Sequence, residues 1–289
     1  MVVLFKQLEE ADLRYISLGA GVQSSVLALM AARGEIEPMP DCAVFADTQW
    51  EPSGIYEHLD WLEAQLPFPV HRVTFGDIRE MVLRTVNEEP EGVYRANSPP
   101  SIPVFLKSSL GEGSLLLRQC TNNFKIRPVQ KKIREVMGYG KGKRLPKGTQ
   151  VEAWVGISRD EVQRVKDSRE WWAVNRYPLI ERMMTRHDCR VWFEENYPGR
   201  TLSRSACIGC PYHNDREWRE MRDNDAESWA DAVDFDHALR SGQRNAFGRE
   251  DPSFLHKSLL PLDEVDLSTE QDRGQLDMFG NECEGMCGV

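Results

Sequence analysis

The stretch RYISLGAGVQSSVLALMAARG, at residues 14–34, constrains the fold more than any other part of this sequence. Residues 13–17 read as a short strand, glycines and serines follow, and residues 24–32 have a helical pattern. The lysine of a G-x-x-x-x-G-K-[ST] phosphate loop is absent. The sequence therefore predicts a strand–turn–helix unit whose turn offers backbone N–H groups, glycines and hydroxyls in place of a lysine.

Strands and helices alternate along the first half of the chain. We predict further strands at 41–48, 70–76 and 151–158, and helices at 52–66, 77–86, 124–136 (apart from Pro128) and 159–165. Alternation of this kind is typical of βαβ units with a parallel sheet. We therefore expect an α/β fold: a parallel, Rossmann-like sheet with helices on both faces.

The remaining segments set the expected domain organisation. Residues 88–112 are polar and are expected to form a loop, whereas residues 171–239 have a mostly helical pattern rich in Trp and Arg. The polar end of the chain is expected to be a flexible tail. We predict an α/β nucleotide-binding domain at 1–165, a mostly helical C-terminal region at 166–262 and a flexible tail at 263–289.

The turn between the first strand and helix is a candidate anion site. Gly19, Gly21, Ser24 and Ser25 lie there, and amides at a helix N-terminus bind phosphate well. The alternative is an ordinary tight turn.

Two further strand ends carry polar residues. Asp47 and Thr48 end the second predicted strand, and Gly156 and Arg159 follow a later one. In open α/β sheets, ligands bind at the carboxyl ends of the strands. These residues are therefore expected to share the rim with the glycine turn, although Asp47 and Thr48 could equally cap a helix.

Cysteine spacing gives the sharpest chemical signal. SACIGCPYH supplies Cys207 and Cys210 as a C-x-x-C, with His213 three residues later, and RQCTNNFKIRP supplies Cys120. Three thiolates with an open position can hold a [4Fe–4S] cluster, whereas three thiolates with His213 would make a structural Zn²⁺ site. A packed turn without metal is the third reading.

The other cysteines divide into two groups. Cys283 and Cys287 lie in the predicted tail, where either would be a delivered nucleophile, a resolving thiol or an incidental exposed residue. Cys42 and Cys189 are expected to pack in the core.

Charge and hydropathy limit the partners. The chain has a net charge of -10, yet residues 125–148 contain nine basic residues and one acidic residue, Glu135. This segment favours a local anionic ligand, a nucleotide or a nucleic acid, over non-specific coating of nucleic acid; the alternative is a solvated helix face. Signal-peptide and membrane-span patterns are absent, so we expect a cytoplasmic protein without a membrane partner.

Taken together, SLGAGVQSS, FADTQWEPSGIYEHLDWL, CTNNFKIRP, GISRDEVQR and CIGCPYHNDREW resemble the phosphoadenosine phosphosulfate reductase-like family of the PP-loop ATP pyrophosphatases, the adenine nucleotide α-hydrolase superfamily. The resemblance covers residues 15–218. It implies a loop that holds ATP (or adenylylated sulfate) with Mg²⁺, and it implies catalytic roles for Asp47, Lys125 and Arg159. By the resemblance, the nucleotide-binding residues are Ser17, Gly19, Gly21, Gln23, Ser24, Ser25, Asp47, Thr48 and Gly156, with Cys120, Cys207 and Cys210 as cluster ligands.

The chain departs from the family pattern at three places, and the two that involve cysteines separate the functional alternatives. Gln23 replaces the usual Asp, Thr121 follows Cys120 where cluster-containing reductases have a second Cys, and the tail reads ECEGMCGV in place of Glu-Cys-Gly. Three cysteines resemble the pattern of PP-loop enzymes that insert sulfur into nucleic acid.

The first hypothesis is therefore ATP-dependent adenylation of a nucleic-acid acceptor, as in DNA phosphorothioation or tRNA thiolation, with a cysteine desulfurase or another sulfur donor as partner. The second is an adenylylsulfate or phosphoadenylylsulfate reductase, in which Cys283 attacks sulfur and thioredoxin releases sulfite. The third is a non-catalytic nucleotide-binding subunit with structural Zn²⁺.

Overall fold

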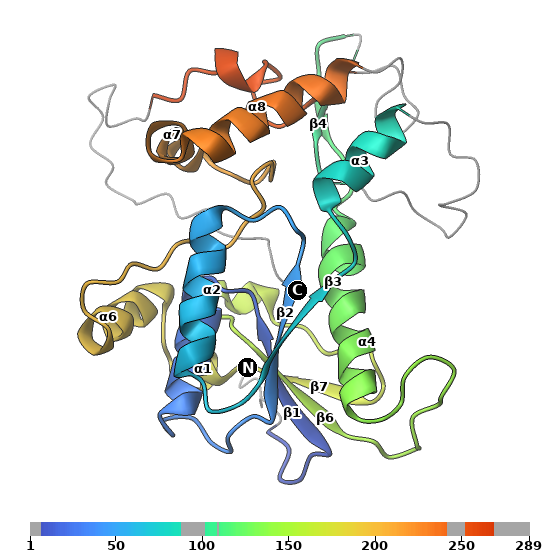
Figure 1. The fold of residues 1–289 in the computed structure, drawn as a ribbon, viewed down its shortest axis with the longest axis vertical. Coiled ribbons are helices and arrows are strands. Elements are labelled where there is room, and N and C mark those ends of the chain that lie inside the picture. The colour runs from blue at the N-terminus through green and yellow to red at the C-terminus, as the bar shows by residue number, and fades with distance from the viewer. Residues whose placement is uncertain (1–6, 88–101, 109, 242–251, 269–289) are drawn as a thin grey trace. The chain divides into compact units, whose positions relative to one another are not determined.

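The computed structural model describes residues 7–87, 102–108, 110–241 and 252–268 (Figure 1). The chain forms two compact units, each assembled from several stretches of sequence. Unit 1 contains Met1–Asp47, Ser53–Thr74 and Ile126–Ser205, and unit 2 contains Thr48–Pro52, Phe75–Lys125 and Ala206–Val289. The contiguous domains 1–165, 166–262 and 263–289 stay predictions, because these two compact units do not test them.

Unit 1 is an α/β unit around a five-stranded sheet, as expected. The strand order is β3-β2-β1-β6-β7, and every pairing is parallel. The strands are β1 (Leu13–Leu18), β2 (Cys42–Asp47), β3 (Val70–Thr74), β6 (Val151–Val155) and β7 (Ala173–Arg176). The helices are α1 (Val22–Ala32), α2 (Ser53–Gln65), α4 (Arg127–Val136), α5 (Pro178–Glu181) and α6 (Arg186–Asn196), with a 3-10 turn, η2, at Arg159–Arg164.

Alternation along the strands builds a core on each face of this sheet. Ile16 of β1 and Phe45 of β2 are buried with residues of α1, α2 and α6. Tyr15 and Val44, one position away, are buried on the other face with residues of α4. Because successive side chains of a strand point to opposite faces, the helices cover both faces of the sheet, α1 and α2 on one and α4 on the other (Figure 1).

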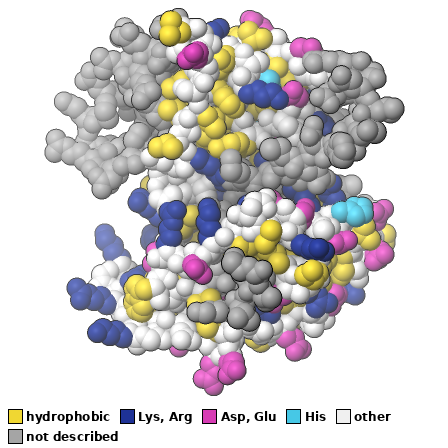
Figure 2. All heavy atoms as spheres, turned by 180° about the vertical axis from the view of Figure 1, so that it is seen from behind, with side chains coloured by type: hydrophobic (Ala, Val, Ile, Leu, Met, Phe, Trp, Pro, Cys, Tyr) yellow, Lys and Arg dark blue, Asp and Glu magenta, His cyan; other side chains and the backbone are white. Residues whose placement is uncertain are grey.

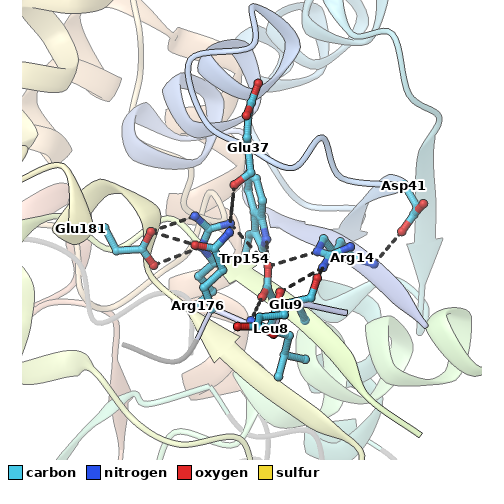
Figure 3. A network of polar contacts seen from close by, with 10 residues as sticks. Leu8, Glu9, Arg14, Glu37, Asp41, Trp154, Arg176 and Glu181 are labelled. Atoms are coloured by element: carbon cyan, nitrogen blue, oxygen red, sulfur yellow. Dashed lines mark hydrogen bonds and ion pairs between the residues drawn. The ribbon is translucent and has the colours of Figure 1, made fainter. Parts of the chain in front are cut away.

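A buried carboxylate holds the amino-terminal half of the sheet together. Glu152 of β6 has no exposed surface and lies 3.7 Å from Nε of Arg14 and 3.5 Å from Nη1 of Arg176, which belong to the flanking strands β1 and β7. Trp154 donates its indole N–H to Glu152 at 2.7 Å, and Arg176 also pairs with Glu181 (Figure 3). Paired charges of this kind are costly to break, because a lost partner leaves the other charge buried.

Unit 2 contains a small antiparallel sheet and a group of helices. The sheet has the order β5-β4-β8, with β4 at Phe105–Lys107, β5 at Gly113–Leu115 and β8 at Ser253–Phe254. The helices are α3 (Ile78–Asn87), α7 (Asp215–Asn224) and α8 (Ala226–Ser241), with a π-helical turn, η1, at Thr121–Ile126 and a 3-10 turn, η3, at Leu262–Glu264. Their core includes Trp218, Phe235 and Phe124, all without exposed surface.

Three local expectations from the sequence need correction. β7 lies inside the segment expected to be helical; it is an edge strand of four residues, AVNR, of mixed polarity, so its apolar signal is weak. β4 lies inside the expected loop at 88–112. Pro128 does not interrupt a helix, because it stands in the first turn of α4, where its missing N–H is not needed. Within the described residues, we find no helix with both the length and the apolar character of a bilayer span.

Candidate functional site

The turn from β1 into α1 is built by glycine and serine. Gly21 caps α1 in an extended conformation without a side-chain hydrogen bond, and Ala20 before it is left-handed, with φ of 54°. Ser24 braces the turn: its hydroxyl accepts from Gly19 N–H at 3.1 Å and donates to Gly21 O at 3.3 Å. Since the cap has no side chain, the amides of the first turn of α1 are available to an anion.

Gly156 fixes the distance between this turn and the end of β6. A Cβ at Gly156 would lie 2.8 Å from Ser24 N and 2.9 Å from Ser24 Cα, both backbone atoms of α1. Contacts below 3.0 Å are not tolerated by real Cβ atoms, so a side chain here would displace α1 or β6. The glycine is required by close approach of two backbones.

The side chains of Gln23 and Ser25 point into the protein. Gln23 Nε2 donates to Glu161 at 2.8 Å and to Ser158 at 3.3 Å, and Ser25 Oγ lies 2.9 Å from Nε2 of His58. Ser25 has no exposed surface, and Gln23 is 9% exposed. The side chains of these two residues, both assigned to nucleotide binding, therefore hold α1 in place. Only their backbone groups remain for a ligand at the turn.

Two titratable groups lie behind the turn, and of these His58 was not identified from the sequence. Burial, reinforced by the charge of Arg200, lowers the pKa of His58 to about 4, so His58 is neutral at pH 7. Burial raises the pKa of Glu161, and the adjacent Arg164 guanidinium opposes this shift. Both lie on predicted helices, where a single His or Glu carries no signal of its partner.

The remaining unit 1 candidates lie in or directly after the strands, as the sequence predicts. Asp47 ends β2 and accepts a hydrogen bond from the hydroxyl of Tyr56 at 2.8 Å. Arg159 begins η2 shortly after β6, and its side chain is exposed. Ser17 is paired within β1, opposite Val44 and Val155, so it lies in the strand and not in the turn.

The three candidate cluster ligands meet in unit 2. Cys120, Cys207 and Cys210 line one narrow pocket, whose space for water-sized molecules is about 30 Å³. Its apolar walls come mainly from buried side chains of unit 2, and two cations also line it. The lining residues are Thr48, Trp50, Ile78, Ile102, Pro103, Arg118, Cys120, Thr121, Lys125, Cys207, Gly209, Cys210, Pro211 and Tyr212.

A polar cluster surrounds the thiol of Cys207. Thr48 Oγ1 lies 3.2 Å from Cys207 Sγ and 3.3 Å from Glu51 Oε1, and Lys125 Nζ lies 3.7 Å from the same carboxylate oxygen. Burial raises the pKa of the Cys207 thiol, Glu51 raises it further, and Lys125 opposes them. Glu51 is only 4% exposed and was missed, although it lies three residues after Thr48, a spacing that could have marked it.

Trp50 fixes the loop between the paired cysteines. Its carbonyl accepts from Ile208 N–H at 2.9 Å, and its indole N–H donates to Asp231. A Cβ at Gly209 would lie 2.1 Å from Trp50 Cη2, so only glycine fits beneath the ring. Thr48, predicted as a helix cap or a nucleotide contact, thus begins the segment Thr48–Pro52 that holds the C-x-x-C loop.

His213 makes its contacts away from the three thiols, and the three thiols are not grouped as ligands of a single metal ion. The ring of His213 lies against Trp218, and its Nε2 is 3.0 Å from the carbonyl oxygen of Cys207. Within the described part of the chain, no three His, Cys, Asp or Glu side chains are grouped closely enough for a single metal ion. Cys120, Cys207 and Cys210 line one pocket, which is smaller than a [4Fe–4S] cluster, so the lining side chains would have to move apart to admit one.

The other cysteines agree with packing or lie outside the described residues. Burial raises the pKa of Cys42 to about 11 and that of Cys189 to about 12, and both are free thiols in the cores of unit 1. Cys283 and Cys287 lie outside the described residues.

Comparison with known proteins gives little beyond the fold. No protein-family model and no curated protein matches the chain. Among solved structures it is similar to the crystal structure of phosphoadenylyl-sulfate (PAPS) reductase from Candida auris in a phosphate complex. Identity is 12%, the match covers 66% of this chain and 80% of that chain, and the TM-score is 0.37.

Proposed function

We propose that this protein is an enzyme of the PP-loop ATP pyrophosphatase type that adenylates a nucleic-acid acceptor for sulfur insertion. The observation that carries the proposal is the glycine-capped start of α1 at the carboxyl end of the parallel sheet. It offers backbone amides in a place where α/β sheets bind nucleotides.

In this proposal ATP binds with its phosphates on the turn at Gly19–Ser24. Ser24 keeps the turn closed around the anion, and Gly156 allows the close approach of β6. Asp47, at the neighbouring strand end, would hold Mg²⁺ on the phosphates, and Arg159 would neutralise their charge.

The reaction has two steps. An oxygen of the acceptor attacks the α-phosphorus of ATP, an O–P bond forms, and pyrophosphate leaves with the electrons of the broken P–O bond. The terminal sulfur of a persulfide on a donor such as a cysteine desulfurase then displaces AMP, which leaves with the activated oxygen, and a second thiol breaks the remaining S–S bond by forming a disulfide with the donor cysteine. Lys125, already near a carboxylate at 3.7 Å, would stabilise negative charge beside the cysteine pocket.

The cysteines support sulfur chemistry by their number and placement. Cys120, Cys207 and Cys210 would hold a [4Fe–4S] cluster, and a cluster with three thiolate ligands supplies an open iron position for a sulfur ligand. The protein's contribution would be to keep this centre in a largely apolar pocket, with the Cys207 backbone and side chain held by His213 and Thr48.

Pyrophosphate release tests the proposal. We expect ATP to yield pyrophosphate and AMP in the presence of an acceptor nucleic acid and a sulfur donor, and we expect loss of this activity in Gly21→Asp, which puts a carboxylate beside the amides. The matched control is Cys283→Ser with Cys287→Ser. Retained activity there agrees with adenylation. ATP-independent sulfite release that disappears in the same double variant would instead establish the reductase alternative.

A further inference from the structure

Exposed cations follow α4 and the loop after it. The basic segment at residues 125–148 is divided between the two units. Lys125 lines the cysteine pocket in unit 2, whereas the other basic residues belong to unit 1. Seen from behind, Lys and Arg side chains gather along this side of unit 1 (Figure 2). The exposed members are Arg127, Lys131, Lys141, Lys143, Arg144 and Lys147.

These charges are largely uncompensated. Among the described residues, Glu135 is the only carboxylate within ion-pair distance of any of the exposed members, and it pairs with Lys131 at 3.9 Å. The Lys131 side chain is 76% exposed even so. Although the chain has a net charge of -10, this surface is locally positive and would attract a polyanion.

The loop that presents the cations has a defined shape. Gly138 ends α4 with φ of 83° and donates to Glu135 O, while Tyr139 N–H donates to Arg134 O at 2.7 Å, which is the Schellman pattern. Arg134 also donates to Lys143 O, and Leu145 is buried against the sheet. These contacts therefore fix the backbone from which the cationic side chains extend.

A hollow lies beside this loop. Its volume is about 460 Å³, in the range of small-molecule sites, and it is lined by Val136, Met137, Tyr139, Lys147 and Thr149. Asp12 also lines it, but its carboxylate accepts a hydrogen bond from Gln150 N–H. An aromatic ring and apolar side chains next to cations match the way proteins bind an unpaired base and its backbone.

The surface lies away from the glycine turn. The loop leads into the start of β6, and Asp12 N–H bonds to Gln150 O at the start of β1. The turn of the proposed nucleotide site is at the opposite, carboxyl end of the same strands. A ligand on the loop is therefore not the ATP phosphates.

We propose that α4 and residues 137–149 form a separate binding surface for single-stranded nucleic acid, with the backbone along the cations and one unpaired base in the hollow beside Tyr139. The inference rests on the proposed nucleic-acid acceptor and adds where, and in which form, that acceptor is held.

Fluorescence anisotropy with labelled single-stranded RNA, single-stranded DNA and duplex DNA of about 20 nucleotides tests the proposal on the full chain. The wild type should bind either single strand more tightly than the duplex. Combining Lys141→Gln, Arg144→Gln and Lys147→Gln should lower the slope of log affinity against log salt by about 2, because each single-strand phosphate contact contributes about 0.7. At about 0.15 M salt this corresponds to a loss of tenfold or more.

Two controls separate this surface from general charge and from misfolding. Removing three cations of α7, with Arg216→Gln, Arg219→Gln and Arg222→Gln, changes the net charge equally and should leave the slope unchanged. Tyr139→Ala should weaken single-strand binding about tenfold, whereas Tyr139→Phe, which keeps the ring, should not.

The proposal is overturned if single strands do not bind, if the α7 control loses as much affinity, or if duplex DNA binds more tightly. Binding to phosphatidylserine vesicles without binding to oligonucleotides would also overturn it. Absence of pyrophosphate release with intact single-strand binding would refute the proposed reaction but leave this surface standing.

Discussion

Replacing Gly156 by alanine tests the packing on which the proposed nucleotide site depends. The new Cβ would lie 2.8 Å and 2.9 Å from backbone atoms of Ser24 and 3.2 Å from the carbonyl carbon of Gln23. Ordinary contacts begin near 3.4 Å, so α1 must move by about half an ångström. Residues 22–31 of α1 are all buried, which leaves the helix no free direction.

Overpacking of this kind costs about 1–3 kcal/mol, and the lower chain entropy of alanine in the unfolded state offsets about 0.4–1 kcal/mol. We therefore expect Gly156→Ala to lower the free energy of unfolding by about 1–2 kcal/mol. Urea unfolding followed by circular dichroism measures this change. The melting temperature should fall by roughly 2–8 °C.

Gly54→Ala is the matched control. No heavy atom lies within 4 Å of a Cβ at Gly54, which stands in the first turn of α2, so alanine should be neutral or stabilising there. If Gly156→Ala unfolds at the same urea concentration as the wild type, the close approach of β6 to α1 is wrong. If the variant is destabilised yet binds ATP with unchanged affinity, the phosphates are not held at this turn.

Four further perturbations have defined outcomes. Glu152→Ala strands two arginines without their shared carboxylate and should cost about 3–5 kcal/mol in urea unfolding, whereas a cost below about 1 kcal/mol would show that the pairs contribute little. Gly209→Ala should destabilise unit 2 by about 1–3 kcal/mol, and Trp50→Phe in the same chain should recover part of that loss; purely additive effects would contradict the contact. As pH falls from about 6.5 to 4, His58 takes up a proton in the unfolded chain but not in the folded protein. The free energy of unfolding should therefore drop by about 3 kcal/mol, and His58→Gln should remove this component of its pH dependence. Anaerobically purified wild type should contain about four irons per chain and Cys207→Ser should lose them, whereas one zinc in place of iron would refute the cluster.

The sheet was predictable because its signals are local. β1, β2 and β6 are bounded by polar or glycine residues and are mostly buried, so they are largely apolar, whereas β3, VHRVT, is a partly exposed strand marked by its valines between two helical segments. β7 was not predicted, because this edge strand of four residues, AVNR, contains almost no apolar run.

The candidate site was predictable in composition and not in arrangement. Glycine and serine marked the turn, and cysteine spacing marked the thiols that line one pocket. The inward direction of Gln23 and Ser25 depends on Glu161 and His58, which are remote in sequence. The basic segment looked like one ligand site, but its residues belong to two units, because the chain passes from unit 2 to unit 1 after Lys125.

The order of the strands has a consequence for synthesis on the ribosome. β1 pairs with β2 on one side and with β6 on the other, and about 130 residues separate the end of β1 from Val151. At translation rates of about 5–20 residues per second, the nascent chain carries β1 with an unfilled edge for on the order of ten seconds. An unpaired, apolar strand edge invites pairing with other chains. Truncated chains that stop before β6 should therefore aggregate, whereas chains that include β7 should not, and the growing protein would benefit from a chaperone during that interval.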